Sequence, residues 1–270
     1  MSGIVLAILS VTVIGLICAV VLAVASILMA VKEDDRFPAL REALPGANCG
    51  ACGYPGCDGY TKALLEGGVK TNLCIPGGDT VSKQLSELLG TEFEDVVEQV
   101  AVIKCKGDCN ATRDKVEYHG IQSCAAARLL GGKGACAFGC LGLGDCLSVC
   151  PSGAICIENG IAHINTRVCT GCGMCTRTCP NHLISLMDDV EKVLVTCSNT
   201  EKGAVTRQAC THGCLGCRRC ERECPQKAIT VKDNLAVIDY SLCIGCGHCA
   251  EVCPTGCILW GDFTNAVQRL

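Results

Sequence analysis

This sequence has few aromatic residues, and it has no charged side chain in its first 31 residues. Phe, Trp and Tyr make up 3% of its 270 residues, which leaves little material for a large conventional hydrophobic core. No basic cluster is present, so binding to nucleic acid is not expected. There is also no P-loop, no G-x-G-x-x-G fingerprint and no nucleophile–base pair, which argues against nucleotide or flavin binding and against an independent catalytic site.

The first 31 residues contain no charged side chain. From Ile4 to Val31 the chain is almost wholly Ile, Val, Leu, Ala and Met, and this run exceeds the roughly 20 residues that cross a bilayer. A secretory signal peptide would begin with basic residues and have a shorter apolar core. Residues 1–31 are therefore expected to be an uncleaved transmembrane anchor in the lipid bilayer, with Cys18 as a small apolar residue of the span.

Cysteine, in contrast, is abundant, with 28 residues that lie mostly in tight runs. One run, from Cys243 to Pro254, reads C-x2-C-x2-C-x3-C-P, the spacing that holds a [4Fe–4S] cluster in bacterial ferredoxins. Disulfide scaffolds are usually short, secreted chains, and structural zinc prefers two well-separated cysteine pairs. The runs therefore favour iron–sulfur clusters, and folding is expected to depend on them. Each cluster would add a charge of about −2 to the formal net charge of −4.

The cysteine motifs repeat at an offset of 74 residues, which indicates duplicated domains. Segments 154–165 and 228–239, each between two motifs, are β-rich and centred on Asn159-Gly160 and Asp233-Asn234, so each predicts a β-hairpin. We therefore expect two tandem ferredoxin-like domains, in residues 131–190 and 191–270. The matching cysteines are Cys136, Cys140, Cys146, Cys150, Cys169, Cys172, Cys175 and Cys179 in the first copy and Cys210, Cys214, Cys220, Cys224, Cys243, Cys246, Cys249 and Cys253 in the second.

In two-cluster ferredoxins the cysteine before the proline of one motif binds the cluster of the other motif. This rule assigns three complete ligand sets. They are Cys214, Cys217, Cys220 with Cys253; Cys243, Cys246, Cys249 with Cys224; and Cys169, Cys172, Cys175 with Cys150.

The fourth set departs from the pattern, because Leu143 stands where Cys217 stands in the second copy. Cys140, Cys146 and Cys179 remain, one thiolate short. We expect Cys136 to supply the missing ligand, with a three-iron cluster or a non-cysteine ligand as alternatives.

Residues 32–79 form a separate module with the spacing C-x2-C-x4-C-x16-C, made by Cys49, Cys52, Cys57 and Cys74. Four thiolates in so short a segment predict one more [4Fe–4S] cluster, with structural zinc as the alternative. Residues 58–65 should be helical in this module. Residues 80–130 are expected to be a helical connecting segment, with a helix over residues 80–102 that breaks at Gly90.

The remaining cysteines are irregular. Cys105, Cys109 and Cys124, with Cys197 or Cys210, form either a sixth site or a group of spare thiols, whereas Cys156 and Cys257 are expected to be packing residues. The sequence thus predicts an α+β protein with an N-terminal transmembrane helix, a small [4Fe–4S] module and two tandem ferredoxin-like 2[4Fe–4S] domains. We expect this protein to bind five [4Fe–4S] clusters, or six if the irregular cysteines form a further site.

The soluble part is expected to face the cytoplasm from a single-pass anchor in the cytoplasmic membrane. Lys32 and Arg36 follow the span, and basic residues favour the cytoplasmic side. No twin-arginine signal precedes the span, and cluster thiolates favour a reducing compartment.

The order of anchor, four-cysteine module and ferredoxin domains resembles the B subunits of the Rnf complex, the ion-translocating ferredoxin:NAD⁺ oxidoreductase of bacterial membranes, in their clostridial form. The run from Asn48 to Cys57 with Cys74, and the run from Cys136 to Pro151, carry this resemblance. It implies that the chain accepts electrons from soluble ferredoxin and relays them to other membrane subunits, in which Na⁺ or H⁺ is translocated. A polyferredoxin subunit of another membrane complex, such as a hydrogenase or dehydrogenase, and a structural zinc protein are the alternatives.

Overall fold

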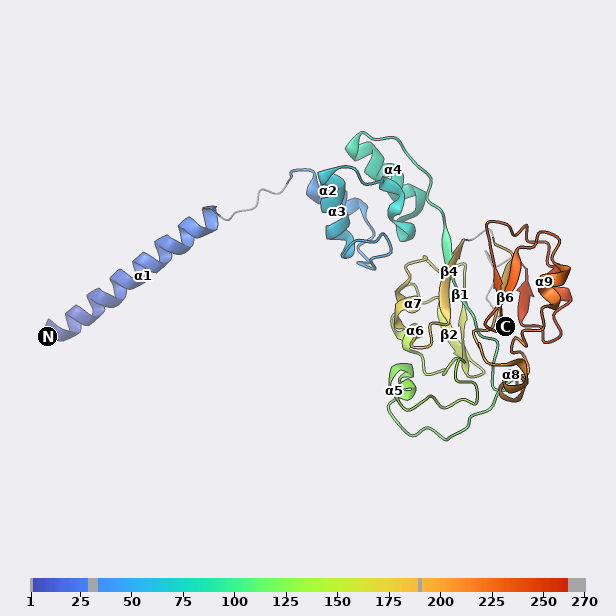
Figure 1. Cartoon of the computed structure of the whole chain (residues 1–270). Helices are drawn as coiled ribbons and strands as arrows, with labels where there is room; N and C mark the ends of the chain where they lie inside the picture. The colour runs from blue at the N-terminus through green and yellow to red at the C-terminus, as the bar shows by residue number, and fades with distance from the viewer. Residues whose placement is uncertain (1, 29–33, 189–190, 262–270) are drawn as a thin grey trace. The chain divides into compact units, whose positions relative to one another are not determined.

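A computed structural model describes residues 2–28, 34–188 and 191–261. It divides into two compact units, residues 1–38 and 39–270, which are described separately (Figure 1). Among the described residues, six helices precede the first strand, and the short strands that follow pair antiparallel, as expected for an α+β protein.

The first unit is dominated by helix α1 (Ser2–Leu28). At 1.5 Å per residue it is about 40 Å long, more than the roughly 30 Å hydrocarbon core of a bilayer. The segment Ile8–Ser26 has a mean hydropathy of 2.9. Its apolar side chains, Leu16 and Leu22 among them, are exposed. The predicted anchor is therefore one helix that is long and apolar enough to cross a membrane.

The four-cysteine module contains helices α2 (Phe37–Ala43), α3 (Gly56–Glu66) and α4 (Gly78–Leu89) and the short helices η1 (Thr71–Leu73) and η2 (Ile75–Gly77). Leu40, Tyr60, Leu64 and Leu85 form its buried core together with Cys57 and Cys74. The helix predicted over residues 58–65 is confirmed by α3. Helix α4 ends at Gly90, whose left-handed backbone caps it, as predicted for that break.

The helix predicted beyond Gly90 is wrong. Residues 92–98 have no regular structure, and Gln99–Ile103 form strand β1. This strand pairs antiparallel with β4 (Ile184–Asp188), 81 residues after Ile103 in the register Ile103–Ile184. The apolar residues of the segment therefore bury themselves against a distant strand, a partner that helical periodicity within residues 80–102 does not reveal.

Both predicted hairpins are confirmed. Strands β2 (Ile155–Glu158) and β3 (Ile161–Ile164) form the first, and β6 (Ile229–Lys232) and β7 (Leu235–Ile238) form the second. The two turn residues of each hairpin have positive φ angles, 50° and 79° in the first and 48° and 61° in the second, which fits a type I′ turn. The two hairpins occupy equivalent places 74 residues apart.

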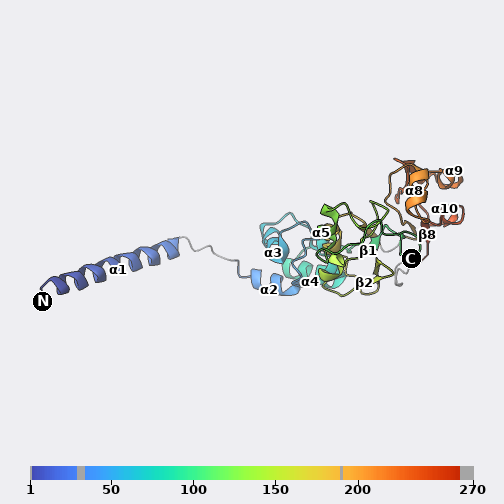
Figure 2. The ribbon, with the colours of Figure 1, turned by 90° about the horizontal axis from the view of Figure 1, so that it is seen from below.

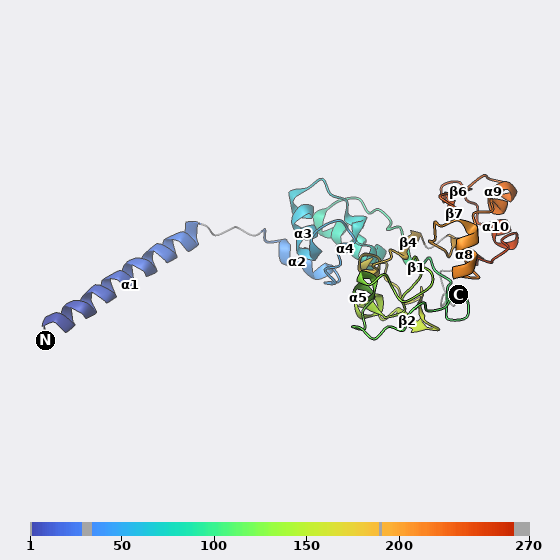
Figure 3. The ribbon, with the colours of Figure 1, turned by 60° about the horizontal axis from the view of Figure 1, so that its bottom comes forward.

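A second strand pair completes each copy. Strand β5 (Val193–Val195) pairs with β8 (Ile258–Trp260), as β1 pairs with β4 in the first copy. Residues of these four strands, Val100, Val102, Met187 and Leu194, share one buried cluster with Leu259 at its edge. The two copies thus pack against each other through equivalent strands. Figure 3 shows the second copy, with β6 and β7, on the side of the first copy where β1 and β4 lie.

Five cysteines of the two copies lie in short helices, α5 (Cys124–Leu129), α6 (Asp145–Ser148) and α7 (Met174–Thr178) in the first copy and α9 (Arg219–Glu223) and α10 (His248–Glu251) in the second. Helix α8 (Gly203–Ala209) contains no cysteine and ends directly before Cys210. Figure 2 shows α8, α9 and α10 together in the second copy. Cysteines also join the cores: Cys146 and Cys175 pack with Ile155 and Ile164. The second core is equivalent, with Cys214, Cys220 and Cys249 beside Ile229.

A substitution at Gly142 tests how closely the loop between Cys140 and Cys146 packs on the β2–β3 hairpin. It has a φ of +66°, and a Cβ there would lie 2.3 Å from the carbonyl oxygen of Gly160. Gly142→Ala should therefore cost the left-handed strain of about 1–2 kcal/mol and an additional ~1–3 kcal/mol of overpacking. The matched control is Gly153→Ala, since Gly153 has a φ of +63° and no atom within 4 Å of the position that a Cβ would take.

The measurement is the midpoint temperature at which visible absorbance is lost, at one scan rate, for the metal-loaded full-length protein. Gly142→Ala should fall below Gly153→Ala by several degrees, at about 2–4 °C per kcal/mol for a chain of this size. Equal midpoints would contradict the close approach of the loop to the hairpin.

Candidate iron–sulfur sites

The cysteines of the second copy gather around two small cavities. One cavity, of about 20 Å³, is lined by Cys214, Cys217, Cys220 and Cys253, and another of the same size by Cys224, Cys243, Cys246 and Cys249. These are the two sets that the cross-over rule predicts. Apolar side chains, including Val231, Ile258 and Ile229, complete the walls.

Local backbone structure directs these thiols inward. Gly216 and Gly245 have positive φ angles, so the chain can turn sharply between successive cysteines. Backbone N–H groups then point at sulfur atoms, as between Gly245 and the sulfur of Cys243 at 3.5 Å. Each motif ends in a short helix, α9 or α10, whose buried cysteine faces the cavity.

The first copy brings together Cys150, Cys169, Cys172 and Cys175. Burial, and to a smaller extent the neighbouring thiols of Cys169, Cys172 and Cys150, raise the pKa of the Cys175 thiol to about 12. The N–H of Ala154 donates to the sulfur of Cys150 at 3.3 Å, and the N–H of Ala101 in β1 donates to Cys169 at 3.3 Å. Strand β1, which the sequence did not predict, thus supports this set.

The altered set contains a different fourth cysteine from the one expected. A cavity of about 20 Å³ is lined by Cys124, Cys140, Cys146 and Cys179. Burial is the main cause that raises the pKa of the Cys146 thiol to about 12, and the nearby thiols of Cys140, Cys124 and Cys179 contribute to the same rise. Cys136 does not line this cavity, so the structure departs from the set expected around Leu143.

The physical reason lies in Asp145, at the start of α6. Its carboxylate accepts hydrogen bonds from the hydroxyl of Ser123 and from the N–H groups of Cys124 and Ala125, each at 2.9 Å. Partial burial would raise the pKa of Asp145, but these hydrogen bonds outweigh it and lower the pKa. The carboxylate therefore anchors the start of α5 beside the loop and presents Cys124 to it. Nothing in the spacing of Cys124 marks this role in the sequence.

The four cysteines of the N-terminal module also converge. Burial is the main cause that raises the pKa of the Cys74 thiol to about 11. The hydrogen bond from the N–H of Gly77 acts in the opposite direction, and the neighbouring thiols of Cys57, Cys52 and Cys49 act in the same direction as burial. Asn48 accepts the N–H of Cys57 at 2.9 Å, which holds the loop closed. Arg177 of α7 donates to the carbonyl oxygen of Cys49, so this module contacts the first copy.

These sets suit a multi-iron group. Burial raises the pKa of Cys74, Cys146, Cys175, Cys220 and Cys249, so these thiols would be protonated without metal and metal binding would release their protons. The hydrogen bond from the thiol of Cys257 instead lowers the pKa of Cys214 and of Cys253. Among the residues that the structure describes, no three Cys, His, Asp or Glu side chains are grouped for a single metal ion. A zinc site needs that tight grouping, at about 2.3 Å from metal to sulfur, whereas each thiolate of a [4Fe–4S] cluster binds a different iron.

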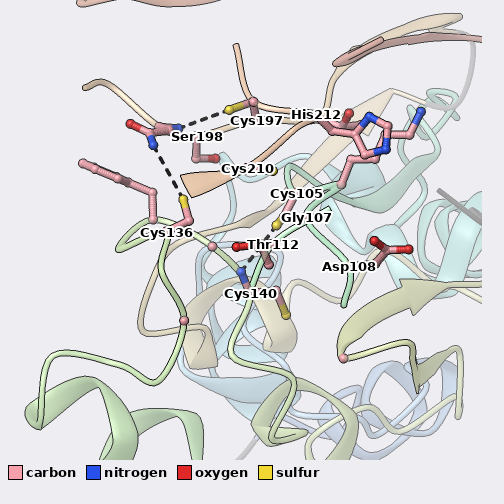
Figure 4. A pocket seen from close by; sticks show the side chains of 18 of the residues that line it. Cys105, Gly107, Asp108, Thr112, Cys136, Cys140, Cys197, Ser198, Cys210 and His212 are labelled. Carbon is pink, nitrogen blue, oxygen red and sulfur yellow. Dashed lines mark hydrogen bonds between the residues drawn. The ribbon is translucent and has the colours of Figure 1, made fainter. Parts of the chain in front are cut away.

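Five further cysteines line a larger cavity of about 250 Å³ (Figure 4). Of the other irregular cysteines, Cys257 is 1% exposed in the second core, in keeping with a packing role, and Cys156 is half-buried in β2. The residues at the large cavity are Cys105, Cys109, Cys136, Cys197 and Cys210.

Asp145→Asn tests the anchor of α5. The substitution removes the charge that accepts three hydrogen bonds, and hydrogen bonds to charged groups contribute about 1.5–3 kcal/mol each. Amide hydrogen exchange at Cys124 and Ala125 should accelerate by roughly tenfold or more. Asp239→Asn is the control, because the carboxylate of Asp239 accepts from the N–H and hydroxyl of Ser241, two residues later in its own turn. Unchanged protection in Asp145→Asn would show that the carboxylate does not hold α5.

Comparison with known proteins agrees with these sites. An Fe-S cluster family model matches residues 44–76, a 4Fe-4S binding domain matches residues 136–154, and 4Fe-4S dicluster domains match residues 168–229 and 213–257. Iron–sulfur clusters are thus the cofactors of this chain.

Curated relatives cover most of the chain. It is 39% identical to the B subunit of the Na⁺-translocating ferredoxin:NAD⁺ oxidoreductase complex of Acetobacterium woodii, over 84% of this chain and 69% of the relative. It is 40% identical to the B subunit of the proton-translocating ferredoxin:NAD⁺ oxidoreductase complex of Clostridium ljungdahlii, over 90% of this chain and 86% of the relative. The B subunit of the ion-translocating oxidoreductase complex of Methanosarcina acetivorans is 36% identical, over 74% and 76%. With its cysteine sets in place and this similarity along most of its length, the chain belongs to the B-subunit family of ion-translocating ferredoxin:NAD⁺ oxidoreductase complexes.

Proposed function

We propose that this chain is the membrane-anchored electron-transfer subunit of an Rnf-type complex, which accepts electrons from reduced ferredoxin and passes them to other membrane subunits. The observation that carries the proposal is the convergence of five sets of four cysteines in one chain. The curated relatives named for ferredoxin:NAD⁺ oxidoreductase complexes support it.

The proposed ligand sets follow the convergence of the thiols, with Cys124 in place of Cys136 in the altered set. When bound, [4Fe–4S] clusters supply one-electron redox centres. The five sets are Cys49, Cys52, Cys57, Cys74; Cys124, Cys140, Cys146, Cys179; Cys150, Cys169, Cys172, Cys175; Cys214, Cys217, Cys220, Cys253; and Cys224, Cys243, Cys246, Cys249.

The protein around the sulfurs sets the reduction potentials. N–H donors to sulfur, such as Leu183 to Cys179 at 3.4 Å, favour the more negative reduced state and raise the potential, whereas exclusion of water lowers it. We propose that the potentials remain low, because the donor is ferredoxin.

The loop with Cys217 is the proposed docking site for ferredoxin. Cys217 is exposed. Arg218 and Arg219 follow it in the sequence and Arg222 lies in the same short helix α9, all three exposed, and Arg218 is paired with Glu221. A ferredoxin gains about −2 of charge with each thiolate-bound cluster, so a basic rim around an exposed cluster ligand attracts it and shortens the path of the electron.

A rescue experiment tests the altered ligand set. Leu143 packs against the cluster of residues that includes Cys124 and aligns with Cys217, so a cysteine at position 143 would restore the regular motif. Cys124→Ala should lose about four irons per chain, one cubane, and adding Leu143→Cys should recover them. Iron and acid-labile sulfide analysis of the purified protein measures both. Recovery in Cys136→Ala instead of Cys124→Ala would assign Cys136 to this set.

Membrane vesicles of opposite sidedness test the donor and the orientation together. In inverted vesicles, reduced ferredoxin added outside should bleach the visible absorbance of the clusters, and protease should remove the domains after the anchor. Right-side-out vesicles should show neither effect. Positive potentials in an EPR-monitored titration, or bleaching only in right-side-out vesicles, would contradict the proposal.

Charge reversal at the proposed docking site can be tested in the same vesicle assay. Arg219→Glu with Arg222→Glu should slow reduction by ferredoxin several-fold at low ionic strength, and the difference should vanish at high salt, because salt screens exposed charges. Lys83→Glu, on the exposed face of α4, should leave the rate unchanged.

A further inference from the structure

The cavity of about 250 Å³ lies between the two copies, and none of the five sets accounts for it. Its walls come from the segment after β1, the start of the first copy, and the segment from β5 to α8 in the second. Figure 4 shows Cys105, Cys136, Cys197 and Cys210 around it.

These four cysteines are two equivalent pairs. Cys136 and Cys210 match at the 74-residue offset of the repeat. Cys105 and Cys197 are 92 residues apart, so the offset does not relate them. Each nevertheless stands two residues after a strand, β1 ending at Ile103 and β5 ending at Val195. The partner strands, β4 and β8, match at the offset of 74 through Ile184 and Ile258.

Hydrogen bonds confirm the second equivalence. The sulfur of Cys105 accepts the N–H of Cys140 at 3.4 Å, and the sulfur of Cys197 accepts the N–H of Cys214 at 3.3 Å. Cys140 and Cys214 match in the repeat. Next to them, the N–H of Lys104 donates to Leu183 and that of Thr196 to Cys257, each at 2.7 Å. Each copy therefore contributes the same two cysteines to one cavity.

The four sulfurs face a common space. Cys105, Cys197 and Cys210 are 7%, 9% and 8% exposed. Burial raises the pKa of each of these three thiols, and the thiol of Cys136 adds to the rise in all three.

Two neighbouring residues show how close the sulfurs are. Asn199 donates from its side chain to Cys136 at 3.6 Å and from its backbone to Cys197 at 3.5 Å. A Cβ on Gly107 would lie 3.3 Å from the sulfur of Cys210 and 3.7 Å from that of Cys105. Asn199 thus places Cys136 near Cys197, and Gly107 places Cys210 near Cys105.

The charge around the cavity suits an anionic group. Lys104, Lys106, Arg113, Lys133 and His212 line it, against Asp108 and Asp114. A thiolate-bound [4Fe–4S] cluster carries about −2, which Lys104, Lys106 and Arg113 offset, while Lys133 is paired with Asp114.

We propose that Cys105, Cys136, Cys197 and Cys210 bind a sixth [4Fe–4S] cluster between the two copies. Cys109 also lines the cavity, but the offset of 92 residues between Cys105 and Cys197 places Glu201 opposite it, so it has no counterpart in the second copy and is not assigned as a ligand. The site adjoins Cys140 of the altered set on one side and Cys214 on the other. Its role as the connection between the two copies rests on the proposed relay function, whereas its existence does not.

Iron and sulfide stoichiometry of the full-length protein, purified without oxygen, is the test. The native chain should hold about 24 irons, six cubanes of four irons. Cys105→Ala and Cys197→Ala should each hold about 20, and their EPR spectra under full reduction should lose one cluster. Cys109→Ala and Cys156→Ala are the matched controls and should keep about 24.

A native content of about 20 irons would overturn the proposal, as would about 20 irons with one zinc. Loss of four irons in Cys109→Ala but not in Cys210→Ala would overturn the assigned ligands. If a variant folds poorly, the iron content of the native protein still shows whether a sixth cluster is present. A protein with about 20 irons that ferredoxin reduces would overturn only the sixth cluster, and one with about 24 that ferredoxin cannot reduce would overturn only the relay.

Discussion

The structure depends on the convergence of buried thiols. Burial in an apolar environment penalises the thiolate, and each thiolate brought near another penalises both, as the raised pKa values of Cys146 and Cys175 show. Several such groups are stable together only when a cationic metal group takes the place of their protons. The short helices, the two-residue hairpin turns and the small apolar cores are arranged around that requirement, and the low aromatic content follows from it, because cysteines occupy positions that larger side chains would otherwise fill.

Features that depend on neighbours in the sequence could be predicted from it. The hairpins were readable because two turn residues fix their register, and the regular ligand sets were readable because three of their four cysteines lie within seven residues. Features that depend on tertiary partners could not. Strand β1 has its partner 81 residues away, and Cys124 reaches its set through the carboxylate of Asp145, 21 residues later. Neither relation leaves a periodic or spaced signal in the chain.

The same distinction explains why the sequence shows the equivalence of Cys136 and Cys210 but not that of Cys105 and Cys197. Cys136 and Cys210 keep the 74-residue offset because they precede the same loop in both copies. Cys105 and Cys197 lose it because the connection between their strand and that loop is longer in the first copy, which carries α5 and its surrounding turns between them. That inserted segment is also the one that delivers Cys124. The longer connection therefore carries the cysteine that lines the cavity beside Leu143, and it also shifts the outer strands out of the 74-residue offset.

Duplication also gives a physical reason for a site between the copies. A pair of cysteines at the edge of one ferredoxin-like fold is too few for a cluster, which needs four thiolates. When two such folds pack through equivalent strands, β1 and β4 against β5 and β8, the same edge is presented twice and two pairs become four. Binding there would stabilise the contact between the copies by mass action, because the separated copies offer only half of the ligands. The packing of the copies and the binding of the metal group are then one equilibrium, so a substitution that loosens either should loosen both.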